Sequence, residues 1–176
     1  MARLVLWLVF LLTPGIAAAQ ASPDDDDGEL DDPAWREADH VLPAVPDEQN
    51  LRAFELSPPS ANRFLLDAAS LSVGADGVIR YTLVVQARGG ARNVTFEGVR
   101  CETSERRIYA SMDKDGHWRP FEHSAWAPIR AAGANNPRAT LASRFFCDSK
   151  VHESSVERIL GRMRGDIDFI GGMSAP

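Results

Sequence analysis

The stretch NVTFEGVRCETSERRIYASMDKDGHWRPFEHSAWAPIR, residues 93–130, decides the fold expected for this chain. Its first part alternates apolar and polar side chains, but the parity changes at Gly98. The apolar positions are Val94 and Phe96 before the glycine and Val99 and Cys101 after it. An extra residue inserted at a glycine is typical of a β-bulge, which turns both halves of a strand toward one core. We therefore expect residues 93–101 to form a bulged strand with one buried face.

Further alternating segments flank this strand. On its C-terminal side Ile108, Ala110 and Met112 alternate with polar residues, and Asp113–Gly116 then forms a turn before a short return strand at His117–Arg119. Strict alternation of this kind predicts a half-buried β-strand. The pattern therefore continues the sheet by one strand and part of another.

A hairpin is expected on the N-terminal side of the stretch. The segments RFLLDAASLSV (63–73) and VIRYTLVVQA (78–87) both alternate with period two, and GADG (74–77) joins them. Two such segments separated by a glycine-containing turn predict a β-hairpin. Together the segments predict an antiparallel meander of four to five strands with one face buried.

Two helices are expected after the strands. The dipeptide NP at 136–137 opens the first, in which Leu141 and Phe145 share one face. Ser154 and Glu157 form a capping box at the start of the second. The apolar stripe of the second helix consists of Val156, Ile159, Leu160 and Met163. The expected fold class is therefore α+β, an antiparallel β-meander with two C-terminal helices packed on one face.

Residues 1–21 have the layout of a secretory signal peptide. Arg3 precedes the uncharged run LVLWLVFLL, and small residues offer cleavage after Ala19 or Ala21. The run is shorter than the roughly 20 apolar residues of a membrane span, and no later run reaches that length. No cysteine follows it that could carry a lipid. We therefore expect a periplasmic protein that is not a lipoprotein and has no transmembrane segment in its mature chain.

The net charge of −6 is concentrated in one segment. Residues 24–32 hold seven acids, and without these and Arg3 the 25 acids and 19 bases fall to eighteen each. A nearly neutral domain gives no reason to expect nucleic acid as a partner. The expected division is listed in chain order: an acidic disordered linker (22–34), an extended proline-rich arm whose AFEL segment forms a short edge strand (35–59), one α+β domain (60–168) and a flexible tail (169–176).

Cys101 and Cys147 are the two cysteines of the chain. In an oxidising compartment an even pair is expected to form a disulfide. The alternative is a reactive thiol with His152 as its base, which requires a cysteine that stays reduced after export.

The histidines do not have the spacing of a metal site. His117 and His123 with Asp113 or Asp115 are the nearest to one, and exposed turn residues are the favoured interpretation. Asp113–Gly116 resembles the start of a calcium loop but lacks the glutamate at its twelfth position. The chain has no Gly-rich nucleotide motif and no C-x-x-C pair, so no metal and no cofactor are expected.

One group of residues suggests a binding surface. Its members are Trp118, Phe121 and Trp126 with Arg119 and Arg130. Aromatic rings interleaved with arginines are typical of grooves that bind a peptide, a glycan or a partner strand. The favoured alternative is that the rings close the open end of the sheet where it meets the helices.

Several motifs together resemble the CNP1-like family. They are NLRAFEL, SLSVGADGVIRYTLVV, NVTFEGVRC, ERRIYA, DGHW, WAPIR and RFFC. The resemblance extends from about Trp35 to the second predicted helix. It implies an exported envelope protein of proteobacterial type, with no catalytic residues to transfer. Cys101 and Cys147 match the paired cysteines of the family, so the resemblance also implies the disulfide.

The expected function is that of a non-enzymatic, disulfide-stabilised binding or structural domain in the periplasm, with an envelope protein or a ligand as its partner. Two alternatives remain open. One is a small hydrolase that uses His117, Asp115 or Glu122 beside Trp118. The other is a ligand-binding module that uses Trp118 and Trp126.

Overall fold

The computed structural model describes residues 34–130 and 137–165. The predictions made for the signal peptide, nearly all of the acidic linker, Asn136 and the C-terminal tail lie outside these residues. No helix within the two described ranges is both long enough and apolar enough to cross a membrane.

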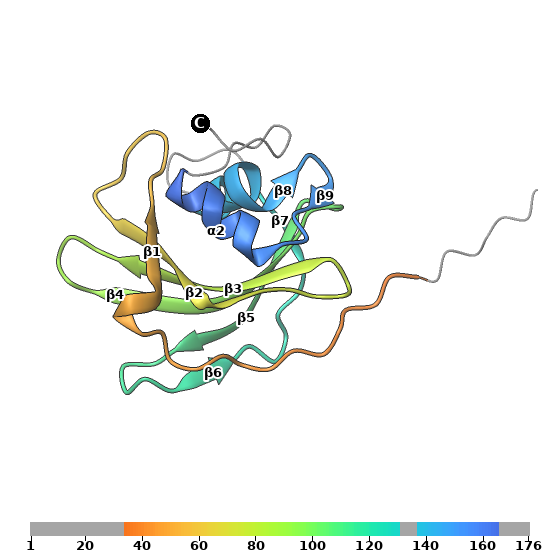
Figure 1. Ribbon diagram of the computed structural model, residues 1–176. Helices are drawn as coiled ribbons and strands as arrows, with labels where there is room; N and C mark the ends of the chain where they lie inside the picture. Colours follow the sequence, from red (N-terminus) through yellow and green to blue (C-terminus); the bar gives the residue numbers. More distant parts are fainter. Residues whose placement is uncertain (1–33, 131–136, 166–176) are drawn as a thin grey trace, which may run out of the picture. The chain divides into compact units, whose positions relative to one another are not determined.

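Within the described residues the domain is built on a seven-stranded antiparallel sheet (Figure 1). The strands are β1 Leu51–Phe54, β2 Arg63–Val73, β3 Val78–Gln86, β4 Arg92–Arg100, β5 Glu105–Met112, β6 Trp118–Pro120 and β7 Ala127–Pro128. Strands β1 to β6 pair in sequence order, and β7 also pairs with β5. The predicted meander is confirmed. The expected AFEL edge strand corresponds to β1 and the expected short return strand to β6. The predicted number of four to five strands is too low, because the count of the meander left out the edge strand and β7, at two residues, is too short to show an alternation.

The predicted hairpin forms from β2 and β3. The Gly77 amide donates to the Gly74 carbonyl across the turn at 3.0 Å, and Gly77 has a φ of 75°. The register shifts between Asp67 and Ser72 of β2, so this strand is irregular next to the turn.

The bulge predicted at Gly98 is wrong. The register between β3 and β4 is continuous from Val78 to Gln86. The irregularity lies instead between β4 and β5, where Phe96 pairs with Ala110 and Glu97 pairs with Ile108, which leaves Tyr109 as the inserted residue. A side chain at Gly98 would collide with the Tyr109 ring, so the glycine provides space for this bulge.

The parity change in β4 reflects burial of both sheet faces. Val99 and Cys101 belong to the core beneath the helices. Val94 and Phe96 pack in two separate clusters with side chains that include Tyr109 and Ala110. The expectation of a single buried face is therefore wrong, because the N-terminal arm covers the second face.

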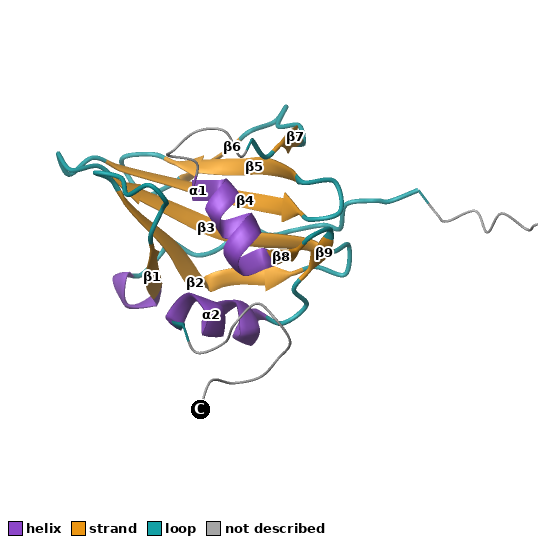
Figure 2. Cartoon of the chain, turned by 90° about the horizontal axis from the view of Figure 1, so that it is seen from above, coloured by secondary structure: helices purple, strands orange, loops and turns teal. Residues whose placement is uncertain are grey.

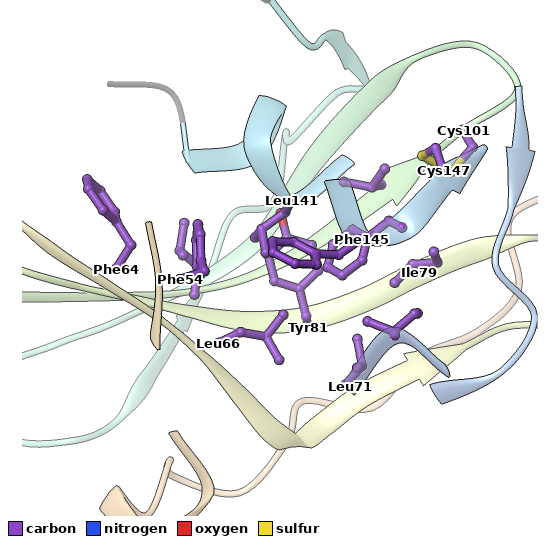
Figure 3. Close-up of a cluster of buried hydrophobic side chains, with 14 of the residues drawn as sticks. Phe54, Phe64, Leu66, Leu71, Ile79, Tyr81, Cys101, Leu141, Phe145 and Cys147 are labelled. Carbon is purple, nitrogen blue, oxygen red and sulfur yellow. A yellow bond between two sulfur atoms is a disulfide. The ribbon is translucent and has the colours of Figure 1, made fainter. Parts of the chain in front are cut away.

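Two helical segments pack on the first face, as predicted (Figure 2). Their bounds are α1 Pro137–Leu141, which continues into a π-helical turn η2 Ala142–Phe146, and α2 Val156–Arg164. Leu141 and Phe145 contact the sheet in the main core, shown in Figure 3, and Ile159 joins them from α2. The cap of α2 is Ser155, one residue later than predicted, because its hydroxyl accepts the Arg158 amide at 3.2 Å.

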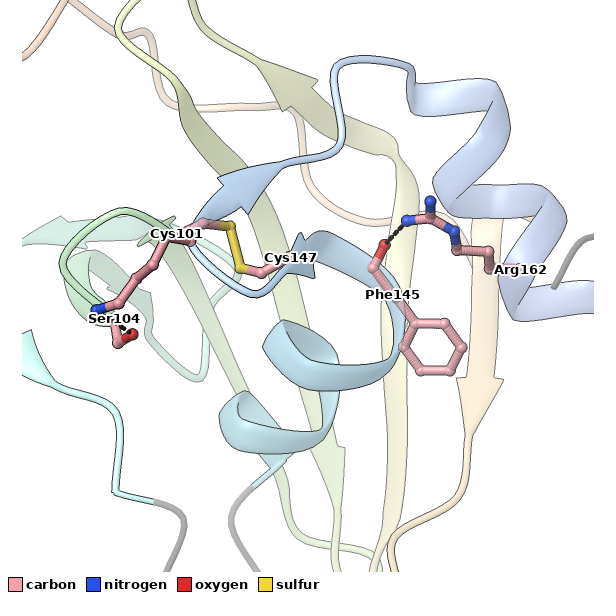
Figure 4. The surroundings of a disulfide bond; sticks show 6 residues. Cys101, Ser104, Phe145, Cys147 and Arg162 are labelled. Carbon is pink, nitrogen blue, oxygen red and sulfur yellow. Dashed lines mark hydrogen bonds between the residues drawn. A yellow bond between two sulfur atoms is a disulfide. The ribbon is translucent and has the colours of Figure 1, made fainter. Parts of the chain in front are cut away.

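A disulfide joins Cys101 at the end of β4 to Cys147 (Figure 4). Cys147 begins the small β8–β9 ladder, Cys147–Asp148 with Val151–His152. The described chain contains no free cysteine, which rules out the thiol–histidine alternative. On the other side of η2, Arg162 donates to the Phe145 carbonyl at 2.9 Å and so ties α2 to η2.

Candidate functional site

The N-terminal arm, defined as residues 35–47, lies at the centre of a cluster of polar and charged side chains. It has no regular secondary structure and crosses the sheet face opposite the helices before it enters the short 3₁₀ helix η1, Glu48–Asn50, and then β1 (Figure 1). Leu42 packs on the cluster of Phe96, Tyr109 and Ala110. The arm thus brings its own side chains to residues that follow it by more than forty positions.

Glu37 is the centre of this contact. Its carboxylate accepts hydrogen bonds from the Tyr109 hydroxyl at 2.7 Å, from Arg107 at 2.6 Å and from the Trp126 indole at 3.1 Å. Arg80 lies 3.5 Å from the same carboxylate. The residues that hold Glu37 and the neighbouring Ala38 are called the Glu37 socket, and they are Asp76, Arg80, Arg107, Tyr109 and Trp126.

The socket shifts the protonation of the groups inside it. Burial alone raises the pKa of Glu37, but the hydrogen bonds from Tyr109, Trp126 and Arg107 outweigh it and hold the pKa below the ordinary value of 4.5. Burial and the hydrogen bond to Glu37 raise the pKa of Tyr109 well above its usual range. Glu37 is therefore a charged acceptor and Tyr109 a neutral donor at neutral pH.

Trp35 anchors the start of the arm. Its indole N–H donates to the Asp76 carbonyl at 2.9 Å, and its ring meets Trp126 edge-on with centroids 6.0 Å apart. The Arg100 guanidinium lies 3.9 Å from the centre of the Trp35 ring, a favourable cation–π distance.

Asp76 and Arg80 hold the backbone of Ala38, the residue that follows Glu37 in the arm. The Ala38 amide donates to the Asp76 carboxylate at 2.8 Å, and Arg80 donates to the Ala38 carbonyl at 3.2 Å and to Asp76 at 2.7 Å. Arg80 itself is buried. The charges of Asp76 and Arg80 are therefore paired with each other, and both side chains also bind the backbone of Ala38.

The arm does not fill the face that it covers. A cavity of about 270 Å³ lies between Ala38–Val41 and the sheet, with Arg80 and Phe96 in its lining. A second one of about 260 Å³ lies between Val45–Pro46 and Val94 with its neighbours. Between the two, the Trp118 indole donates to the Pro43 carbonyl at 2.8 Å and holds the arm against the sheet.

A separate open groove of about 550 Å³ lies at the β5–β6 edge of the sheet. It is called the edge groove and is lined by Arg106, Ile108, Pro120, Phe121, Glu122, His123, Ser124 and Ala125. Phe121 is 49% exposed, which is unusual for a ring of this size. The groove therefore combines an accessible aromatic side chain with charged residues at its rim.

The structure divides the binding surface that the sequence suggested. Trp118 and Trp126 donate to the arm and are half-buried. Phe121 lines the edge groove. Arg119 forms an ion pair of 2.7 Å with Asp113 in the hairpin turn, and Arg130 is exposed. The alternative, that the rings close the end of the sheet where it meets the helices, did not include the arm. The indoles of Trp118 and Trp126 donate hydrogen bonds to the arm.

The residues of the hydrolase alternative do not form one site. The side chain of His117 is 71% exposed at the hairpin turn, 3.7 Å from Asp113. Asp115 pairs with Lys114 in the same turn, whereas Glu122 lines the edge groove with His123. In the two described ranges no group of three or more histidine, cysteine or acidic residues could hold a metal ion.

Sequence reasoning missed Glu37, Arg107 and Tyr109. The sequence pattern that could have indicated Glu37 is its spacing from Trp35. One residue separates the two, which in an extended chain places both side chains on the same side. Nothing near them in the sequence indicates the partner strand.

Comparison with known proteins supports the resemblance described above. The model of the CNP1-like family matches residues 30–164, which include the arm, the sheet, the disulfide and α2. The chain belongs to the CNP1-like family. No curated protein and no solved structure matches this CNP1-like chain. Because the match begins at residue 30, the arm is part of the CNP1-like unit.

Proposed function

We propose that this CNP1-like protein is an exported, non-enzymatic binding domain, stabilised by its disulfide, and that the edge groove receives a protein partner in the cell envelope. The observation that carries the proposal is the half-exposed Phe121 in an open groove of about 550 Å³. Apolar contact area surrounded by charged rim residues is the usual composition of a protein interface. Ile108 and Phe121 supply the former, and Arg106 and Glu122 the latter.

The arrangement of charges favours binding over catalysis. Glu37, Asp76, Arg80 and Arg107 form a cluster of charged side chains, and their contacts fix the arm. An acid–base catalyst needs a group that can reach a substrate and exchange a proton with it. Groups already engaged with one another and with the arm do not meet that requirement.

Site-specific photo-crosslinking in intact cells tests the binding proposal. Phe121 is replaced by a photoreactive phenylalanine, which preserves the aromatic ring. Val151, which is 66% exposed in the β8–β9 ladder, is replaced in the same way as the control. We expect a defined protein adduct from position 121 and none of the same mass from position 151. Equal adducts from both positions, or no adduct from position 121, would contradict the proposal.

Export is tested separately. We expect fractionation to find the protein in the periplasm and N-terminal sequencing of the mature form to begin at Gln20 or Ser22, after Ala19 or Ala21. Recovery from the cytoplasm with Met1 in place would contradict the export proposal and leave the test of the groove unaffected.

A further inference from the structure

The edge groove lies at a gap in the pairing of β5. Strand β6 pairs with Ala110–Met112, and β7 pairs with Glu105–Arg106 on the same edge. Between these two ladders, residues 107–109 have no ladder partner on this edge within the described parts of the chain. The gap is therefore about 10 Å long and is bounded by a short strand at each end.

The backbone of Ile108 faces this gap. The Ser104 carbonyl accepts the Ile129 amide at 2.9 Å, so Ser104 directs its hydrogen-bonding groups toward β7. This direction alternates along a strand, and Ile108, four residues further on, directs its groups to the same edge. At the other end of the gap the Tyr109 carbonyl accepts the Phe121 amide at 2.8 Å. Ile108 therefore presents backbone groups that an incoming segment can bond.

A cation and an apolar side chain lie next to each other in the lining of the groove. Arg106 and Ile108 are two positions apart on β5, so their side chains share one face about 7 Å apart. Phe121 extends the apolar wall from the turn after β6. Among the described residues Arg106 forms no ion pair, although Glu122 lines the same groove. The groove therefore has a positive charge available beside its apolar wall.

We propose that the edge groove holds the C-terminal residue of its protein partner, an inference that rests on the function proposed above. The terminal carboxylate pairs with Arg106, because a guanidinium matches a carboxylate with two N–H donors. The side chain of the same residue is apolar and packs on Ile108 and Phe121. Capture of a terminal carboxylate is an established mode of peptide recognition, and here the exposed backbone of Ile108 adds to it.

The length of the gap favours a chain end over a strand that passes through. A strand added to the edge of a sheet pairs over about three to ten residues. Here β6 and β7 occupy the edge on both sides of residues 107–109, so a partner chain cannot continue along β5 in either direction. A chain that ends in the gap avoids both strands, and its last residue carries the anion that Arg106 can pair with.

Binding of a short peptide to the full-length mature protein tests the proposal. The probe is acetyl-GSGSF with a free carboxylate, and the control is the same peptide with an amidated C-terminus. We expect the free acid to shift the amide resonances of Ile108 and Phe121 with a Kd below about 1 mM, and the amide to bind at least about tenfold more weakly. Equal binding of the two peptides, or no shift with the free acid at about 1 mM, would overturn the proposal.

Two substitutions in the groove should change this affinity in opposite directions. Arg106→Gln removes the cation, and we expect the free acid to bind at least about tenfold more weakly. Glu122→Gln removes a like charge from the rim and should strengthen binding about twofold. Arg63→Gln, at an exposed arginine of β2, is the matched control and should leave the affinity unchanged. Equal losses in Arg63→Gln and Arg106→Gln, or weaker binding in Glu122→Gln, would contradict a carboxylate beside Arg106.

Cross-linking from position 121 distinguishes this inference from the proposed function. The adduct is digested, and the partner peptide attached to position 121 is sequenced by mass spectrometry. We expect that peptide to include the C-terminal residue of the partner. An internal partner peptide would overturn the capture of a chain end and leave the binding function of the groove in place, whereas the absence of any adduct would contradict both.

Discussion

The Glu37 carboxylate accepts a hydrogen bond of 2.7 Å from the Tyr109 hydroxyl, which lies 72 residues further along the chain. This contact depends on the bulge in β5, because Tyr109 is the inserted residue and packs in the same cluster as its neighbour Ala110. Gly98 on the adjacent strand leaves the space that the ring occupies. One irregularity of the sheet therefore positions the group that holds the arm.

Substitution of Glu37→Gln should loosen the arm. The amide retains the shape of the carboxylate but loses the charge that Arg107 and Arg80 face. We expect the free energy of unfolding to fall by about 1.5–3 kcal/mol, the range for hydrogen bonds to charged groups. Chemical denaturation followed by tryptophan fluorescence measures the change, since Trp35 and Trp126 both adjoin Glu37.

The control for this variant is Asp39→Asn, on the same arm but exposed. Removal of an exposed charge should change stability by less than about 0.5 kcal/mol. If the two variants lose the same amount, the effect of Glu37→Gln comes from net charge and the socket has no special part in it.

Gly98→Ala should disturb the same contact from the other side. A Cβ at this position meets the Tyr109 ring and hydroxyl, so the ring must shift, and we expect its hydrogen bond to Glu37 to be disturbed. Overpacking of this kind destabilises by about 1–3 kcal/mol. Gly89→Ala is the matched control, because a Cβ there has no atom within 4 Å. The comparison requires only thermal or chemical unfolding of the two variants.

A double-mutant cycle with Tyr109→Phe then identifies the cause. Removal of the hydroxyl should reduce the loss caused by Gly98→Ala, because the closest atom is gone. Additive losses in the double variant would mean that Gly98 matters for the conformation of β4 and not for the space that it leaves to Tyr109.

The local part of this fold could be predicted from sequence, and the long-range part could not. The β2–β3 hairpin and the stripe of α2 follow from period and turn residues within a short window. The change of parity at Gly98 was equally visible, but it has two physical causes, an inserted residue or burial of both faces. The sequence around Gly98 cannot distinguish them, because the second cause lies in an arm that comes more than fifty residues earlier.

The candidate site was harder still to predict for the same reason. Trp118 and Trp126 stood out as aromatic residues near arginines, but their indoles turn out to hold Pro43 and Glu37. An irregular arm has no hydrophobic period, so nothing in its sequence indicates the face that it covers. Of the three rings, Phe121 is the one that lines the edge groove.

The stability of the arm should depend on pH in two separate ranges. Glu37 has a folded pKa below its ordinary 4.5, so its contribution is present above that value and is lost as the pH falls through the folded pKa. Burial, Arg80 and Arg107 lower the pKa of His40 below 6.5, although Glu37 opposes them. The neutral form of His40 is therefore favoured in the folded state, and stability declines as the pH falls below 6.5 toward the folded pKa.

Hydrogen exchange of the arm amides across the pH range measures both effects. We expect His40→Gln to remove the decline below pH 6.5 and to leave the decline at lower pH in place. Glu37→Gln should remove the decline at lower pH and leave the decline below pH 6.5 in place. An identical pH profile in His40→Gln and the unmodified protein would show that His40 plays no part in holding the arm.

Removal of the disulfide should lower stability strongly. Cys101 and Cys147 are 46 residues apart, and in the chain-entropy model a loop of that length corresponds to about 4 kcal/mol. The double variant Cys101→Ser and Cys147→Ser should lose about that much in chemical denaturation, and the unmodified protein in reductant should lose the same. Thiol titration of the denatured protein without reductant should find no free cysteine. Two titratable thiols, or an unchanged denaturation midpoint, would contradict the stabilising role of the cross-link.

On the helix face a second buried carboxylate fixes α1 to the sheet. Glu97 of β4 is fully buried and accepts hydrogen bonds from the Thr95 and Tyr81 hydroxyls and, at 2.6 Å, from Arg138 of α1. Arg138→Met should therefore leave an uncompensated buried charge and lower the free energy of unfolding by about 3–5 kcal/mol. Arg144→Met, at an exposed arginine of η2, is the control and should have little effect.

The double variant Glu97→Met and Arg138→Met tests whether the loss in Arg138→Met comes from the unpaired charge of Glu97 or from the lost interactions themselves. Removal of both partners leaves no unpaired charge, and apolar replacements of buried ion pairs are often neutral. We expect the double variant to be more stable than Arg138→Met alone in chemical denaturation. If it is less stable than the single variant, the hydrogen bonds that Glu97 makes with Arg138 and with the Tyr81 and Thr95 hydroxyls stabilise this part of the core, and the charge left by Arg138→Met is not the main cause of the loss.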